Sequence, residues 1–274
     1  MHAPIEHARG GRNEVGCPVI RLVYSNRTEA LRDALSETLE AVRTDPLLPD
    51  HVVVPNRNME RHLELSLTAH VGVSANMRFH RLERFVGRWI ARALDRRLLT
   101  RAGLERLVLR ALLDEAWLSD PVVRPLAHYA LPAAQLGEEG APWEAVDVRR
   151  AQLAQRLATL FEGYSFSRPE LLDRWSRPAN AASDDPVERW QSALWRRILE
   201  TRGSALSLPE ALSQIARRGT KPGRLPDHVH VFGLSYVARV FLWAFAELGR
   251  ATNLHLYVLN PCMEFWEDVP SASE

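Results

Sequence analysis

Val19-Ile20-Arg21-Leu22-Val23-Tyr24 is an apolar run that we predict to be a strand, and the polar turn Ser25-Asn26-Arg27 follows it. A helix is expected directly after the turn, because Asn26 can cap it, Glu29 follows at capping-box spacing and leucines recur at helical spacing. The next apolar run, His51-Val52-Val53-Val54-Pro55, is short and continuous, which is typical of a buried parallel strand. Strand, helix and strand in this order predict a βαβ unit and an α/β fold with a parallel sheet.

A long helical segment interrupts this predicted sheet. Helical periodicity dominates from about Asn58 to Gly219, where we expect no further strand. Strands return at Val229-His230-Val231-Phe232 and from Asn253 to Leu259, with a helix over about 236–249 between them. These ranges predict a disordered leader at 1–17, the first part of the α/β domain at 18–77, a helical insertion at 78–225 and a return to the α/β domain at 226–274. Because the sequence stops just after a strand and leaves a bare edge, we expect the α/β domain to be truncated at its C-terminus.

Composition sets broad limits on the class of protein. With 46% hydrophobic and 25% charged residues, the 274-residue chain has the make-up of a soluble globular protein. Its net charge of +1 does not by itself indicate a nucleic acid or a membrane as partner. The two distant cysteines, Cys17 and Cys262, fit neither a disulfide framework nor a zinc motif, which favours the cytoplasm. No segment has the pattern of a signal peptide or a membrane span, so we expect no membrane partner.

The turn after the first strand lacks the residues of a phosphate-binding loop. Such a loop needs glycines, a lysine for the β and γ phosphates and a Ser or Thr for Mg²⁺, whereas this turn reads Tyr24-Ser25-Asn26-Arg27-Thr28. The strand that would carry a Mg²⁺-binding carboxylate reads His230-Val231-Phe232-Gly233-Leu234-Ser235 and contains no acid. We therefore predict no catalytic residue for ATP hydrolysis. An active nucleotide hydrolase with an atypical phosphate loop stays open as an alternative.

A serine hydrolase is a further, less favoured alternative. Gly233-Leu234-Ser235-Tyr236-Val237 stands at a predicted strand-to-helix turn and resembles a nucleophile elbow. Val237 replaces the second glycine of that motif, and a β-branched side chain would crowd the tight turn. The order of serine, acid and histidine also fails, because the last histidine, His255, precedes Asp268. A plain strand-ending turn is favoured over a catalytic Ser235.

Metal-binding and nuclease sites are not supported either. His228 and His230 lie on one face of their strand by alternation, and His255 and Cys262 could lie close to them. The tight spacings of a metal site are absent, so we expect no metal. Lys221 is the only lysine and has no carboxylate pattern around it, so a nuclease site of that type is not predicted.

Arginine spacing is more informative than these motifs. Five arginines recur every three or four residues and should line one face of a helix: Arg81, Arg84, Arg88, Arg92 and Arg96. From Arg78 to Arg110 there are ten arginines and three acidic residues, so the local charge is 10 − 3 = +7. This face either contacts phosphates or is a solvated face of an arginine-rich protein, and the sequence leaves both open. Tryptophans of the helical segment are expected in the core rather than stacked on DNA bases: Trp89, Trp117, Trp143, Trp175, Trp190 and Trp195.

Several short motifs follow one another in a characteristic order: Leu22-Val23-Tyr24-Ser25-Asn26-Arg27; Asn58-Met59, His62-Leu63 and Gly72-Val73-Ser74-Ala75-Asn76; Leu160-Phe161-Glu162-Gly163-Tyr164 with Arg168-Pro169-Glu170 and Trp175; Trp190-Gln191 and Leu194-Trp195; Phe232-Gly233-Leu234-Ser235, Asn260-Pro261-Cys262 and Trp266-Glu267-Asp268-Val269. In this order they resemble the RecC-type gamma subunit of exodeoxyribonuclease V, the RecBCD helicase–nuclease complex. Little resemblance is found between about Arg96 and Asp147. Family members are far longer, so only their N-terminal portion is covered.

The resemblance implies a degenerate, catalytically inactive P-loop-helicase-like fold, similar to a superfamily 1 motor domain, with a large helical insertion. It implies a non-catalytic subunit that binds single- and double-stranded DNA and assembles with motor and nuclease subunits of RecB and RecD type. Such a subunit guides single strands and scans one of them for a recombination signal. ATP and Mg²⁺ are then expected in the partner subunits and not in this chain.

The resemblance also carries signal-reading positions over to this sequence. By position they correspond to Pro55, Arg57, Arg61, Arg81, Thr159, Leu160, Glu162 and Arg168. Leu160, Glu162 and Arg168 keep the chemical character that the family has there. A first group of positions departs from the family: Pro55, Arg57, Arg61 and Arg81 stand where the family has uncharged side chains. Proline has no side-chain donor, and arginine favours phosphates or guanine edges. We therefore predict that DNA binding persists while the recognised signal differs or is lost.

Overall fold

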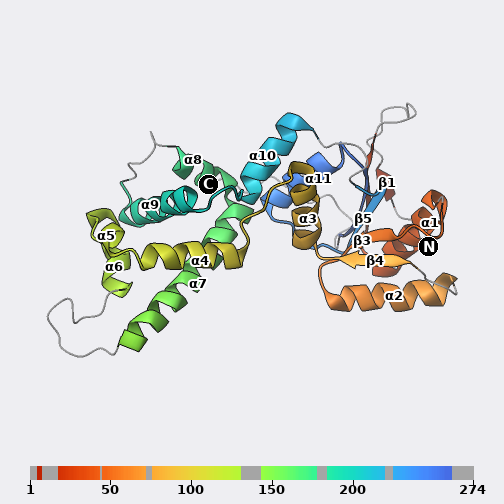
Figure 1. Cartoon of the computed structure of the whole chain (residues 1–274). Helices are drawn as coiled ribbons and strands as arrows, with labels where there is room; N and C mark the ends of the chain where they lie inside the picture. The colour runs from red at the N-terminus through yellow and green to blue at the C-terminus, as the bar shows by residue number, and fades with distance from the viewer. Residues whose placement is uncertain are drawn as a thin grey trace, which may run out of the picture. The chain divides into compact units, whose positions relative to one another are not determined.

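The computed structural model describes residues 5–7, 18–43, 45–71, 76–130, 143–177, 184–219 and 225–260 (Figure 1). The chain forms two compact units. The sheet unit comprises residues 1–94, 215–237 and 242–274, and the helical unit comprises residues 95–214 and 238–241. None of the helices in the described ranges combines the length and apolar character that crossing a membrane requires.

Six strands form the sheet: β1 (Ile5–His7), β2 (Ile20–Ser25), β3 (Asp50–Val53), β4 (Met77–His80), β5 (His228–Phe232) and β6 (Asn253–Leu259). Their order across the sheet is β1-β2-β6-β5-β3-β4. The strands from β2 to β4 in this order pair in parallel, and β1 pairs with β2 antiparallel. The predicted α/β fold with a parallel sheet is thus confirmed, and the four predicted strands correspond to β2, β3, β5 and β6.

Two strands differ from the prediction. β4 lies within the segment from Asn58 to Gly219, so the expectation of no strand there is wrong. The four residues of β4 alternate between apolar and polar, a pattern too short to stand out in the sequence, and the strand pairs with β3 from Asp50↔Met77 to Val53↔His80. β1 lies in the leader that we expected to be disordered, and Ile5–His7 pair with β2 instead. The leader residues outside this strand, 1–4 and 8–17, lie outside the described residues.

Both faces of the central strands β3 and β5 are buried. α1 (Thr28–Val42) and α2 (Arg57–Val71) pack against one face. The core on this face consists of leucines from the two helices and apolar strand residues: Leu31, Leu35, Leu39, Leu63, Leu67, Val23, Val52, Val54, Phe232 and Tyr257. On the other face Val53, Val229 and Val231 are buried as well. Burial on both sides explains why the β3 region reads as a continuous apolar run.

α1 begins without the predicted cap. Its N-cap residue is Arg27, which makes no side-chain cap hydrogen bond, so the predicted capping by Asn26 is wrong. The Ser25 hydroxyl accepts the Arg27 N–H at 3.2 Å and thereby tightens the turn one residue earlier. A serine hydroxyl that accepts the N–H two residues later forms a local turn, and such a turn competes with a capping box.

The helical unit is built from short and long helices: α4 (Arg101–Leu112), α5 (Glu115–Leu118), η1 (Pro121–Val123), α6 (Arg124–Ala130), α7 (Trp143–Ser167), α8 (Pro169–Ser176) and α9 (Pro186–Thr201). Three further helices are α3 (Leu82–Leu94) in the sheet unit, and α10 (Leu208–Arg218) and α11 (Arg239–Leu248), each of which spans a boundary between the units.

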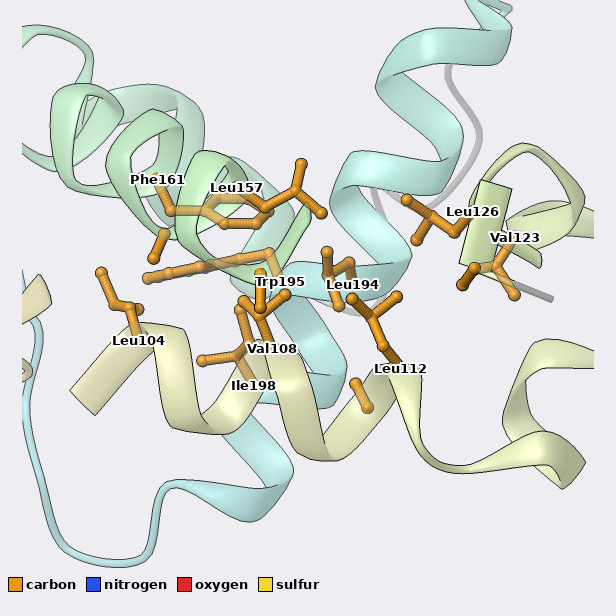
Figure 2. Packing of buried hydrophobic residues seen from close by; sticks show 14 of the residues in the cluster. Leu104, Val108, Leu112, Val123, Leu126, Leu157, Phe161, Leu194, Trp195 and Ile198 are labelled. Carbon is orange, nitrogen blue, oxygen red and sulfur yellow. The ribbon is translucent and has the colours of Figure 1, made fainter. Parts of the chain in front are cut away.

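The core of the helical unit consists mainly of leucine, valine and alanine side chains around three buried aromatic residues, Phe161, Trp175 and Trp195 (Figure 2). Trp195 lies against Phe161 with ring centroids 5.5 Å apart, and Phe161 also meets Trp175 edge-on at 6.5 Å. The prediction that tryptophans form core is confirmed for Trp89, Trp175 and Trp195, which are buried. Among the remaining predicted tryptophans, Trp117 and Trp190 are half-buried and pack against the same core, and the side chain of residue 143 lies outside the described residues.

Candidate nucleic-acid interface

The carboxyl ends of β3 and β5 meet at one edge of the sheet. Val53 pairs with Val231, so Pro55 and Gly233 follow their strands at the same level. From β3 the chain passes through α2 to β4 on one side, whereas from β5 it passes through α11 to β6 on the other. Adjacent parallel strands whose connections leave in opposite directions form a topological switch point, where open α/β sheets bind ligands. This edge is therefore the place in the sheet unit where a ligand is expected.

α2 begins at this edge and carries two exposed arginines. Asn56 caps the helix, since its Oδ1 accepts the Met59 N–H at 2.9 Å. Arg57 and Arg61 lie one turn apart and are both exposed, and neither forms an ion pair within the described part of the chain. Both guanidinium groups are thus available to contact phosphates.

Arg81 lies at the same edge but is held by α2. The Val54 N–H donates to the His80 carbonyl at 2.9 Å, which places Arg81 beside Pro55 at the ends of neighbouring strands. The Nη2 of Arg81 donates to Glu60 Oε2 at 2.8 Å, and its buried Nη1 has no hydrogen-bond partner among the described residues. The carboxylate of Glu60 neutralises part of this charge, so Arg81 is less free to bind DNA than the two exposed arginines of α2.

The predicted five-arginine face is only partly formed. α3 carries three of the residues, Arg84, Arg88 and Arg92, and all three are exposed. Arg81 precedes the helix, and Arg96 follows its end, because Asp95 adopts a left-handed φ of 52° and stops the helix. The expectation that all five line one face is therefore wrong, although a three-arginine stripe remains.

The second group of predicted residues lies in the helical unit. Thr159, Leu160 and Glu162 lie on α7, and Arg168 follows the helix as the N-cap residue of α8. Thr159 and Arg168 are exposed, whereas Leu160 packs against the core of this unit. Glu162 Oε2 lies 3.8 Å from the Arg101 guanidinium. Each of the two groups of predicted residues is thus placed within its own unit, and their assignment to DNA binding stays a prediction.

The place of a phosphate loop is taken by a minimal turn. β2 ends at Ser25 and α1 begins at Thr28, so Asn26 and Arg27 alone connect them. This connection is too short to wrap around phosphates with backbone N–H groups. β5, where a Mg²⁺-binding carboxylate would lie, consists of His228–Phe232 and has no acidic residue. The geometry does not support the nucleotide-hydrolase alternative.

The surroundings of Ser235 do not support a serine hydrolase. Gly233 adopts a left-handed φ of 70°, and the following helix begins only at Arg239, not near residue 236 as predicted. Ser235 therefore lies at an exposed bend four residues before the helix and not at an elbow that leads directly into it. No hydrogen bond joins Ser235 to any of the histidines in the described ranges.

The histidines of β5 and β6 meet as alternation suggests. His228 Nδ1 lies 3.1 Å from His255 Nε2, and the rings of His230 and His255 stack with centroids 4.7 Å apart. His230 Nδ1 lies 3.3 Å from the Tyr257 hydroxyl. Stacked rings do not direct their nitrogens to a common point, and within the described residues no three His, Cys, Asp or Glu side chains are arranged to hold a metal ion. Both Cys262 and Lys221 lie outside the described residues.

Burial keeps this histidine cluster neutral. Desolvation lowers the pKa of His255 to about 4, with further lowering by His228 and Arg21. Burial also lowers the pKa of His230 to well below its usual value, and the neighbouring histidines add to the effect. The pKa of Tyr257 is raised to about 12 by burial. Neutral rings can stack inside the sheet core, whereas charged rings would repel one another there.

Comparison with known proteins identifies the family. The family described as RecC, N-terminal domain, matches residues 20–274. The chain belongs to the RecC N-terminal domain family. Similar relatives are the RecBCD enzyme subunits RecC of Haemophilus influenzae, 24% identical over 90% of this chain, of Escherichia coli, 25% identical over 92%, and of Mycolicibacterium smegmatis, 27% identical over 90%. These matches cover 24%, 22% and 22% of the relatives, so the chain spans about a quarter of the RecC proteins that it matches.

The RecC resemblance is thus confirmed, but position-by-position transfer leaves out residues that shape the edge. Glu60 pairs with Arg81, and Met59 lies where a Cβ on Gly233 would come within 3.1 Å of its Cε. The sequence gives no signal for either contact, because each joins α2 to a segment that is distant in sequence and that only the folded sheet brings close. The capping Asn56 has a signal, since Asn before a helical stripe is a common N-cap.

Proposed function

We propose that this chain is the N-terminal part of a non-catalytic DNA-binding and scaffolding subunit of an ATP-dependent exodeoxyribonuclease V. The observation that carries the proposal is the RecC N-terminal domain match over residues 20–274. Partners of RecB and RecD type, which supply the motors, the nuclease, ATP and Mg²⁺, are part of the proposal. So are a cytoplasmic role in recombinational repair of double-strand breaks and the guiding and scanning of single-stranded DNA.

The geometry of the sheet unit supports a non-catalytic role. A parallel sheet of this kind is the scaffold of motor domains, yet only Asn26 and Arg27 stand where a phosphate loop would be. We propose that the fold is a degenerate P-loop-helicase-like domain of the superfamily 1 type with a helical insertion. Such a domain keeps the DNA-binding edge of a motor without its ATPase.

The exposed arginines support DNA as the ligand. Arg57 and Arg61 have no ion-pair partner among the described residues and lie at the switch-point edge, and Arg168 is exposed in the helical unit. Phosphate contacts of this kind give affinity without sequence preference, whereas base contacts set the signal. The arginines and Pro55 at signal-reading positions therefore support a subunit that binds DNA but reads a changed signal or none.

Binding of single-stranded DNA across a salt series tests this proposal. The purified chain should bind a labelled oligonucleotide without nucleotide, and the affinity should fall steeply as salt rises. Each of Arg57→Ala, Arg61→Ala and Arg168→Ala should weaken binding by about tenfold and lower the slope of log K against log salt by about 0.7. Arg218→Ala, at an exposed arginine near the end of α10, is the matched control and should leave both quantities unchanged.

Two results would count against the proposal. Absence of binding even at low salt would remove DNA guiding from this part of the subunit. Equal losses for Arg218→Ala and for the three test variants would show that overall charge, and not the proposed surface, attracts the DNA.

A further inference from the structure

Two segments of the helical unit share a five-residue motif. Asp120-Pro121-Val122-Val123-Arg124 and Asp185-Pro186-Val187-Glu188-Arg189 both read Asp-Pro-Val-x-Arg. Each copy begins a helix, η1 in one case and α9 in the other, with the proline as the first helical residue. In each copy the aspartate Oδ1 accepts the N–H of the valine, at 2.9 Å for Val122 and at 2.8 Å for Val187. The same helix start is thus built twice in this unit.

The two copies of the motif line one pocket, which we call the η1–α9 pocket. It has a volume of about 500 Å³ and lies where η1 and α6 pack against α9. Val123 and Leu126 are buried in the core of the unit (Figure 2), so the helices that carry the lining residues are held in place from the inside. The lining is mostly apolar and includes four exposed residues: Pro121, Val122, Pro125 and Pro186.

The charge at this pocket is positive. The arginines of the two motifs, Arg124 and Arg189, line it together with His128, and all three are exposed. Neither arginine forms an ion pair within the described part of the chain. None of the described residues that line the pocket is acidic, and the aspartates of the motifs bind backbone N–H groups at their own helix starts. An apolar lining and two cations without a partner therefore occur at one place.

We propose that the η1–α9 pocket binds an acidic segment of a protein partner, which inserts one large apolar side chain between the two motifs. The proline and valine side chains would remove that side chain from water, and Arg124 and Arg189 would pair with carboxylates beside it. A nucleic acid fits this pocket less well, because the lining offers no aromatic ring other than that of His128 on which a base could stack. The inference goes beyond the proposed function and does not depend on DNA binding.

Binding of three labelled peptides to the purified chain tests the proposal. The first peptide carries one phenylalanine flanked by aspartates, the second has serine in place of the phenylalanine, and the third has asparagines in place of the aspartates. We expect fluorescence anisotropy to show binding of the first peptide and roughly tenfold weaker binding of the other two. Both the apolar side chain and the carboxylates are then required.

Substitutions in the lining locate the binding site. Arg124→Ala and Arg189→Ala should each weaken binding of the first peptide roughly tenfold. Val122→Asp should abolish it, because a carboxylate in the lining repels the aspartates, and the fold should tolerate this change since Val122 is 42% exposed. Arg106→Ala, at an exposed arginine of α4 outside the lining, is the matched control and should leave peptide binding unchanged.

The outcomes distinguish a protein ligand from a nucleic acid and from a general charge effect. The proposal is refuted if the unmodified chain binds none of the peptides or binds all three equally, or if Arg106→Ala weakens peptide binding as much as Arg124→Ala. It is also refuted if Arg124→Ala and Arg189→Ala weaken binding of oligothymidylate and not of the peptide. Peptide binding by a chain that does not bind oligothymidylate would support this inference while the DNA-binding function fails.

Discussion

Replacing Trp195 by alanine is expected to lower the free energy of unfolding of the helical unit by about 3–5 kcal/mol. The side chain is 2% exposed, and its ring lies against Phe161 with centroids 5.5 Å apart. Its Nε1 also donates to the Ser176 hydroxyl at 3.2 Å, and that hydroxyl would lose a partner. The substitution lowers the free energy of unfolding in three ways. It removes buried apolar area, it leaves a cavity within the cluster in Figure 2, and it breaks a hydrogen bond.

Chemical denaturation measured by circular dichroism tests this expectation. Trp117→Ala is the matched control, because Trp117 is only half-buried and packs at the margin of the same core. It should cost clearly less than the Trp195 substitution. If the two variants lose the same stability, or if Trp195→Ala costs less than about 1 kcal/mol, Trp195 is not a central core residue.

Mild acid is expected to destabilise the sheet unit before its carboxylates protonate. A histidine whose folded pKa lies below its unfolded value stabilises the fold above the unfolded pKa, and this stabilisation is lost as the pH falls towards the folded pKa. For His255 the window runs from 6.5 down to about 4. At about 1.36 kcal/mol per pH unit, this residue alone should cost roughly 2 kcal/mol between pH 6.5 and about pH 5.

Neighbouring histidines act in the same window. Burial and the neighbouring His255 lower the pKa of His230. On the other face of the sheet, burial, His51 and two arginines lower the pKa of His80 to about 4. Hydrogen bonds from Arg202 and Ser207 lower the pKa of the Glu210 carboxyl despite its burial. The stability that this carboxylate contributes is therefore lost only when the pH falls below its usual pKa of 4.5. The range from pH 6.5 to about pH 5 therefore isolates the histidines.

Denaturant midpoints measured between pH 7 and about pH 5 check this expectation. His255→Gln removes one titrating ring and should flatten the pH dependence, whereas His62→Gln, at an exposed position of α2, should leave it as it is. Equal stability of the unmodified chain at both ends of this range would contradict a neutral buried cluster.

The sequence predicts four of the six strands and misses β1 and β4. At β3 the residues Val52-Val53-Val54 form a continuous apolar run because both faces of the strand are buried, and this signal is local. β4, with the residues Met77–His80, has no such pattern and exists only through its pairing with β3. Its alternation of apolar and polar residues is only four residues long, and pairing is a tertiary property, so the local signal is too short to separate this strand from the helical pattern around it.

The same distinction applies to the candidate site. Alternation places His228 and His230 on one face, and the structure stacks His230 on His255. The arginine spacing correctly predicts exposed residues on α3 but not the end of the helix, which depends on the backbone of Asp95. The ion pair of Arg81 with Glu60 joins the residue after β4 to α2, and no spacing rule reaches across such a distance in sequence.

The most direct test of a DNA-binding subunit without an ATPase is the affinity of the chain for labelled single-stranded DNA at low salt, measured with and without ATP at constant Mg²⁺ and ionic strength. We predict clear binding with the same affinity in both conditions, because only Asn26 and Arg27 connect β2 to α1 and the exposed arginines need no nucleotide. Absence of binding, or an affinity that changes when ATP is added at constant Mg²⁺ and ionic strength, would contradict the account.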